Sequence, residues 1–167
     1  MRGPSLPLAG DGLLQPLSLV ALVGLLVNDH VLKGLAAGTP WGLLTGKLSD
    51  CCGLLFLPVL LVAASEILAS CINAFRGPSA RAAVVVAVVV AALFCLMKTV
   101  PWVGARYVDV VSVLQWPGFA LVALIDGSQM PGLRRVAHVV DPTDLIALPF
   151  AFSVVWQTQR RARRVDG

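Results

Sequence analysis

Long apolar runs separated by short polar breaks dominate this sequence. Three runs, at about 13–33, 45–75 and 80–101, contain almost no charge in their middle parts. A helix of about 20 apolar residues crosses the roughly 30 Å hydrocarbon core of a bilayer, and each run is at least that long. The breaks hold turn-forming and interfacial residues, among them Gly77-Pro78 and Pro101-Trp102. The pattern predicts three transmembrane helices.

A fourth helix is predicted at about 141–158 from its start signal. Asp141 precedes Pro142, so a capping side chain stands before a proline at the first helical position, and Asp144 follows in the first turn. We therefore expect an all-α fold, a polytopic transmembrane helix bundle with four spanning helices.

The stretch at 104–140 is the most ambiguous part of the chain. It is apolar over much of its length, but Asp109 and Gln115 lie within it and Pro117-Gly118 is expected to interrupt it. We predict an interfacial or re-entrant segment here, on the outer side of the membrane. A fifth spanning helix is the alternative.

Composition agrees with a membrane location. Of the 167 residues, 57% are hydrophobic and 13% are charged, whereas roughly a quarter of the residues in a soluble domain are charged. So few charges cannot cover a water-exposed surface, and the apolar surface must face lipid. The length leaves no room for a sizeable soluble domain, so 1–167 is predicted as a single membrane domain. Its expected partner is the lipid bilayer.

The basic C-terminal tail at 159–167 suggests an orientation. A run of arginines directly after a membrane helix is typical of a cytoplasmic anchor that meets anionic lipid headgroups, and we do not expect nucleic-acid binding. Four crossings then place both termini in the cytoplasm of a multi-pass protein of the plasma or inner cell membrane. The count of Lys and Arg alone slightly favours five crossings. We choose four because they gather the acidic helix ends at one face.

These helix ends form the candidate site. Ionisable groups at a bilayer boundary are costly unless they are paired or hydrated, and inside a bundle they mark a possible functional site. The candidate catalytic residues are Asp50, Lys98 and Asp144. The candidate binding residues are Asn28, Asp29, Lys33, Lys47, Asp141 and Glu66.

A structural interpretation exists for several of them. Asp29 and Lys33 are spaced i,i+4 and Lys47 and Asp50 are spaced i,i+3, so each pair can form locally on one helix. For Asp141, a role as a helix cap is a sufficient structural explanation. By contrast, Lys98 follows a long apolar run without a nearby acid and is expected to pair with a carboxylate from another helix.

Glu66 is expected near the middle of the second helix, in a polar stripe with Ser70 and Asn73. A carboxyl group at mid-membrane depth is costly, so it should face the bundle interior. It would be either a hydrogen-bonded structural group or part of a proton or ion relay.

The sequence leaves the biochemical activity open among three classes. A membrane-embedded, carboxylate-dependent enzyme would use Asp50 and Asp144 as a pair that shares a proton and activates water, with Lys98 or Lys33 orienting the substrate. A small transporter or channel subunit would use Glu66, and four helices would then require a homo-oligomer. A membrane assembly or scaffold protein would use 104–140. No cofactor and no metal site is predicted.

Overall fold

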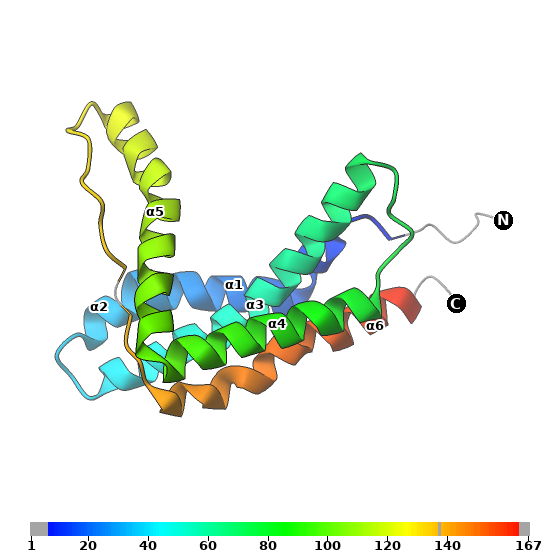
Figure 1. Ribbon diagram of the computed structural model, residues 1–167, viewed down its shortest axis with the longest axis horizontal. Helices are drawn as coiled ribbons and strands as arrows, with labels where there is room; N and C mark the ends of the chain where they lie inside the picture. Colours follow the sequence, from blue (N-terminus) through cyan, green and yellow to red (C-terminus); the bar gives the residue numbers. More distant parts are fainter. Residues whose placement is uncertain (1–6, 137, 164–167) are drawn as a thin grey trace. The chain divides into compact units, whose positions relative to one another are not determined.

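The computed structural model describes residues 7–136 and 138–163, and within these ranges it is helical with no β-strand (Figure 1). This confirms the predicted all-α fold. Four helices are long and apolar enough to cross a membrane: Pro16–Ala36, Trp41–Cys71, Ala80–Thr99 and Pro101–Asp126. Four helices of this kind identify a multi-pass membrane protein.

The first of these helices is assembled from three consecutive elements, α1 (Pro16–Val27), the π-helical turn η2 (Asn28–Leu32) and α2 (Lys33–Ala36). A short 3₁₀ turn, η1 (Asp11–Leu14), precedes it. Pro16 occupies the first turn of α1, where its missing N–H costs nothing because the first four N–H groups of a helix have no partner inside it.

The helix α3 (Trp41–Cys71) begins and ends earlier than the predicted 45–75. It starts directly after Pro40. It stops before Asn73, whose φ of 57° is the left-handed conformation that ends helices. Glu66 therefore lies five residues before the end of α3, and the prediction that it sits near the middle of this helix is wrong.

The segment at 104–140 contains more helix than expected. After α4 (Ala80–Thr99), the extended residue Val100 separates α4 from α5 (Pro101–Asp126), and α5 continues through Pro117 without a break. The predicted interruption at Pro117-Gly118 is thus wrong, because a proline removes one backbone hydrogen bond but an apolar helix can tolerate this loss.

The predicted last helix, 141–158, differs in form and length. It consists of a 3₁₀ helix, η3 (Pro142–Phe152), followed by α6 (Ser153–Arg163), and it is not among the four candidate spans. Part of the predicted tail at 159–167 is helical, since α6 extends to Arg163. Residues 164–167 of that tail lie outside the described residues.

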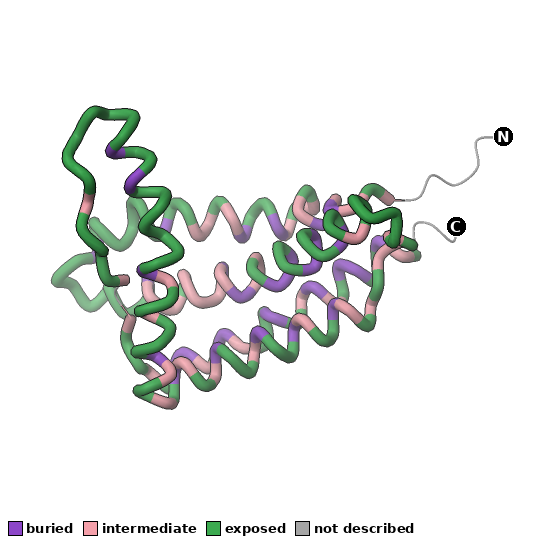
Figure 2. Tube along the Cα trace, turned by 45° about the horizontal axis from the view of Figure 1, so that its top comes forward, coloured by how far each residue is buried: buried purple, intermediate pink, exposed green. Residues whose placement is uncertain are grey.

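The chain divides into two compact units. Unit 1 comprises the residues up to Ala92 and those from Ile146 onward. Its helices α1 and α3 lie side by side, and the buried positions line the facing sides of its helices (Figure 2). Its core joins α3, α4 and α6 through Val59, Val62, Ala83, Ala87 and Val154. The two alanines are fully buried, and small residues allow the close helix approach on which packing in lipid depends.

Unit 2, residues 93–145, is built on α5 and the chain that follows it. Residues 128–136 have no regular structure and run back along α5. Trp116 Nε1 donates to the carbonyl of Pro131 at 2.9 Å, and the N–H of Val136 donates to Ser112 Oγ at 3.0 Å. The chain thus leaves the end of α4 and returns beside it, where Lys98 meets Asp144.

Candidate functional site

Asp29 is the centre of a polar cluster in unit 1. Its Oδ1 atom lies 2.7 Å from Lys33 Nζ and accepts a hydrogen bond of 2.9 Å from Ser49 Oγ. Lys33 Nζ also donates to Ser49 Oγ at 3.3 Å. The side chains of Lys33 and Asp29 keep 44% and 38% of their surface exposed. The cluster therefore holds an accessible carboxylate, ammonium group and hydroxyl group within hydrogen-bonding distance of one another.

The π-helical turn η2 positions this cluster. In a π-helix each N–H reaches the carbonyl five residues back, and here the Lys33 N–H bonds to Asn28. Such wide turns are rare and occur often at functional sites. Asn28 is fully buried and its Nδ2 donates to the carbonyl of Thr45 at 2.8 Å, which ties η2 to α3. Its Oδ1 has no hydrogen-bond partner among the described residues.

The local pairing predicted for Asp29 and Lys33 is confirmed. The inter-helix partner Ser49 was not anticipated, although it stands beside two candidates on α3. Lys47 and Asp50 are both partly buried on α3, in the same two turns as Ser49. Asp50 belongs to unit 1 and Asp144 to unit 2, so the predicted Asp50–Asp144 pair stays a prediction.

Lys98 and Asp144 form a second charged site, within unit 2. Lys98 Nζ lies 2.7 Å from Asp144 Oδ2, and the two side chains are 8% and 10% exposed. Lys98 also lies 5.5 Å from the centre of the Phe94 ring. The expectation that Lys98 pairs with a carboxylate from another helix is confirmed. A buried cation near the end of α4 and a buried anion in the first turn of η3 also match the helix dipoles.

Asp141 caps the helical segment as predicted. Its Oδ1 accepts hydrogen bonds from the N–H and the hydroxyl of Thr143, at 2.9 and 2.8 Å. Because Asp141 satisfies the N–H of Thr143 in the first turn of η3, the cap alone accounts for an aspartate at this position. A binding role for Asp141 stays a prediction.

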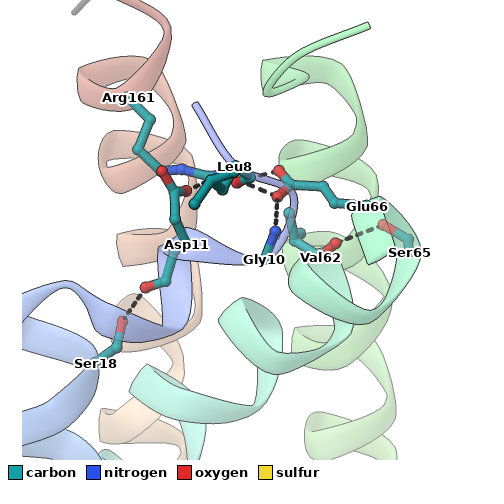
Figure 3. Close-up of polar contacts among 9 residues, drawn as sticks. Leu8, Gly10, Asp11, Ser18, Val62, Ser65, Glu66 and Arg161 are labelled. Atoms are coloured by element: carbon teal, nitrogen blue, oxygen red, sulfur yellow. Dashed lines mark hydrogen bonds and ion pairs between the residues drawn. The ribbon is translucent and has the colours of Figure 1, made fainter. Parts of the chain in front are cut away.

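Glu66 lies in an ion-pair cluster that sequence reasoning missed (Figure 3). Arg161 Nη1 and Nη2 donate to its two carboxylate oxygens at 2.9 and 2.8 Å, and the N–H of Gly10 donates to Oε2 at 2.9 Å. Asp11 pairs with the same guanidinium. Glu66 and Arg161 are 6% and 5% exposed. The predicted basic tail therefore contributes a buried partner for Glu66.

The two clusters of unit 1 stand near the two ends of α3. Ser49 and Glu66 are 17 residues apart on this helix, which corresponds to about 26 Å along its axis at 1.5 Å per residue. This separation approaches the thickness of the hydrocarbon core. The chain's first described segment, through Gly10 and Asp11, and its last, through Arg161, meet at the Glu66 end.

No group of three or more His, Cys, Asp or Glu side chains among the described residues is arranged to hold a metal ion.

No model of a known protein family, no curated protein and no solved structure matches this chain.

Proposed function

We propose that this multi-pass protein is a carboxylate-dependent enzyme of the plasma or inner cell membrane, and that its Asp29 cluster acts on a polar group at the outer membrane face. The observation that carries the proposal is the accessible contact of Asp29 with Ser49 and Lys33 across two helices. It refines the predicted outer cluster, in which Asp29, Lys33 and Lys47 served for binding and Asp50, Lys98 and Asp144 for catalysis.

The chemistry follows from the hydrogen bonds. Ser49 donates its hydroxyl proton to Asp29, so the carboxylate can accept that proton as Ser49, or a water molecule in its place, attacks a substrate. Lys33 lies within 3.3 Å of Ser49 Oγ and can neutralise negative charge that develops there. Asn28 orients η2 and so positions Asp29.

Three features support an orientation with both termini in the cytoplasm. The first and last described segments meet at the Glu66 end of α3. Arg160 and Arg163 are exposed near that end, where anionic lipid headgroups can bind them. The chain after α5 returns as an irregular segment, and lipid-exposed irregular backbone does not cross a bilayer. An α5 that lies in the outer interface, with η3 and α6 together as the fourth crossing, avoids that crossing.

The transporter alternative finds less support. It needs a Glu66 carboxyl that exchanges protons or ions at mid-membrane depth, whereas Glu66 accepts hydrogen bonds on both oxygens and lies near a helix end. The scaffold alternative is favoured by one observation, the apolar side chains that α5 exposes, such as Leu114, Leu124 and Ile125.

The test uses purified protein in lipid nanodiscs, incubated with a lipid and peptide extract of the host membrane. Mass spectrometry compares wild type with Asp29→Asn and Ser49→Ala. We expect wild type to consume a component that Asp29→Asn leaves intact, with a loss of at least about 100-fold in rate because general-base catalysis contributes about that much or more.

Asp109→Asn is the matched control. Asp109 is also an exposed, ion-paired aspartate on a helix, with 48% of its side chain accessible, and its variant should act like wild type. An Asp29→Asn protein that folds and shows the wild-type product profile would rule out this carboxylate. If wild type also leaves every component of the extract unchanged, the scaffold function becomes the better account.

A further inference from the structure

One face of α6 carries polar groups whose hydrogen bonds are incomplete. Ser153, Gln157 and Arg161 are spaced i,i+4, so they form one stripe along the helix. Each contributes a buried atom without a hydrogen-bond partner among the described residues: Ser153 Oγ, Gln157 Nε2 and Arg161 Nε. Buried polar atoms are nearly always hydrogen-bonded, to protein or to ordered water. Three such atoms in one stripe indicate a shared ligand that the described residues do not supply.

The surroundings of Gln157 show which hydrogen bonds this ligand must form. Gln157 is 1% exposed and Ser18 is fully buried. Ser18 Oγ lies 3.0 Å from the carbonyl of Gly12 and 2.9 Å from Gln157 Oε1, yet its hydroxyl has one proton for these two acceptors. If the Gln157 amide turns over, Nε2 donates to Ser18 and Oε1 becomes the atom without a partner. In either orientation of the amide, the ligand has to form a hydrogen bond with it.

The stripe leads to the Glu66 end of unit 1. Arg161 donates hydrogen bonds to both oxygens of Glu66 and also pairs with Asp11 (Figure 3). The side chain of Asp11 is 31% exposed. Asp11 thus connects the buried groups with the surface at the end where the first and last described segments meet. From Arg161 to Ser153 the stripe is eight residues long, or about 12 Å.

Beside this stripe, α6 also places an apolar side chain in the core of unit 1. Val154 is 1% exposed and packs into the core with Val59 and Ala87. Val154 is therefore as buried as Gln157, but its side chain has no polar atom. On the polar face, three buried atoms lack a hydrogen-bond partner among the described residues.

We infer that Ser153, Gln157 and Arg161 line a water-filled crevice, which enters unit 1 beside Asp11 and reaches inward along α6. Its ligand is water, because water can both donate to and accept from the amide of Gln157, the hydroxyl of Ser153 and the guanidinium of Arg161. The crevice brings water to Nε of Arg161 from the end of the bundle opposite the Asp29 cluster, whereas both oxygens of Glu66 stay covered by the guanidinium and by the N–H of Gly10.

The experiment measures cysteine reactivity along α6. Ser153→Cys and Gln157→Cys are compared with Val154→Cys as the matched dry control, in full-length protein in nanodiscs. The probe is a small charged methanethiosulfonate, and peptide mass spectrometry reads each cysteine separately. The native Cys71, which is exposed, reports on the reagent, and the buried Cys52 reports on a dry native site.

We expect the cysteines introduced at positions 153 and 157 to react at least about tenfold faster than the one at position 154, because a thiol reacts as its thiolate and dry apolar surroundings suppress its ionisation. Equally slow reaction at all three positions would overturn the inference. Equally fast reaction would overturn it too, because it would indicate a loosened bundle and not a crevice on one face. If Gln157→Cys fails to fold, Ser153→Cys and Ser18→Cys, which change one atom each, supply the same comparison.

Discussion

Removal of Arg161 should destabilise the protein far more than removal of an exposed arginine. Arg161→Met deletes two charge-assisted hydrogen bonds to Glu66, of 2.9 and 2.8 Å, together with the ion pair to Asp11, and leaves the Glu66 carboxylate with the N–H of Gly10. Both side chains of the pair are almost fully buried. Removing one partner of such a pair costs about 3–5 kcal/mol, because the remaining charge is left in a poorly solvated place.

The double variant Glu66→Gln/Arg161→Met separates the charge effect from simple loss of contact. The glutamine introduced at position 66 can still accept from Gly10, and no unpaired charge remains at that position. We expect a cost of about 1–3 kcal/mol, the range for incomplete hydrogen bonding of buried groups. The double variant should therefore be more stable than Arg161→Met alone.

The free energy of unfolding can be measured in mixed micelles by titration with sodium dodecyl sulfate, followed by tryptophan fluorescence. Arg135→Met is the control, because Arg135 pairs with Asp109 at 2.7 Å but 68% of its side chain is exposed. Its loss should cost less than about 1 kcal/mol. A similarly small cost for Arg161→Met, or a double variant less stable than Arg161→Met, would show that Glu66 and Arg161 are not a sequestered pair.

Three further predictions concern other parts of the chain. Asn28→Ala should lower stability by about 1–3 kcal/mol, because the carbonyl of Thr45 loses its donor, and thermal unfolding followed by size-exclusion chromatography measures this. Lys98→Met should cost about 3–5 kcal/mol in the same assay by leaving Asp144 buried without its cation, and Asp144→Asn in addition should recover part of it. A cysteine introduced in place of Gln129 should be labelled from outside intact cells by an impermeant reagent while a C-terminal tag stays cytoplasmic; protection there would contradict four crossings.

Sequence reasoning succeeded where a local pattern carries the physics. Apolar run length reflects bilayer thickness, and this placed three of the long helices to within a few residues. The i,i+4 spacing of Asp29 and Lys33 and the cap at Asp141 are set by helix geometry within a few residues, so both were predicted and observed. Even the non-local pairing of Lys98 was expected, because its charge ends a long apolar helix.

The tertiary structure decided which distant groups satisfy one another. Glu66 and Arg161 are 95 residues apart in sequence, and Ser18 and Gln157 are 139 apart. Spacing along a single helix contains no information about such contacts. Arg161 was therefore predicted to face lipid headgroups, whereas in the structure it is buried against Glu66. Ser49 joined Asp29 for the same reason, since only the packing of η2 on α3 brings them together.

The apolar runs by themselves determined that this chain belongs in a membrane, because insertion depends on the summed transfer energies of about 20 consecutive side chains and not on contacts between distant parts of the chain. What only the fold determined is where the few polar groups meet. Their energies depend on distance and burial, which arise when helices far apart in sequence pack together.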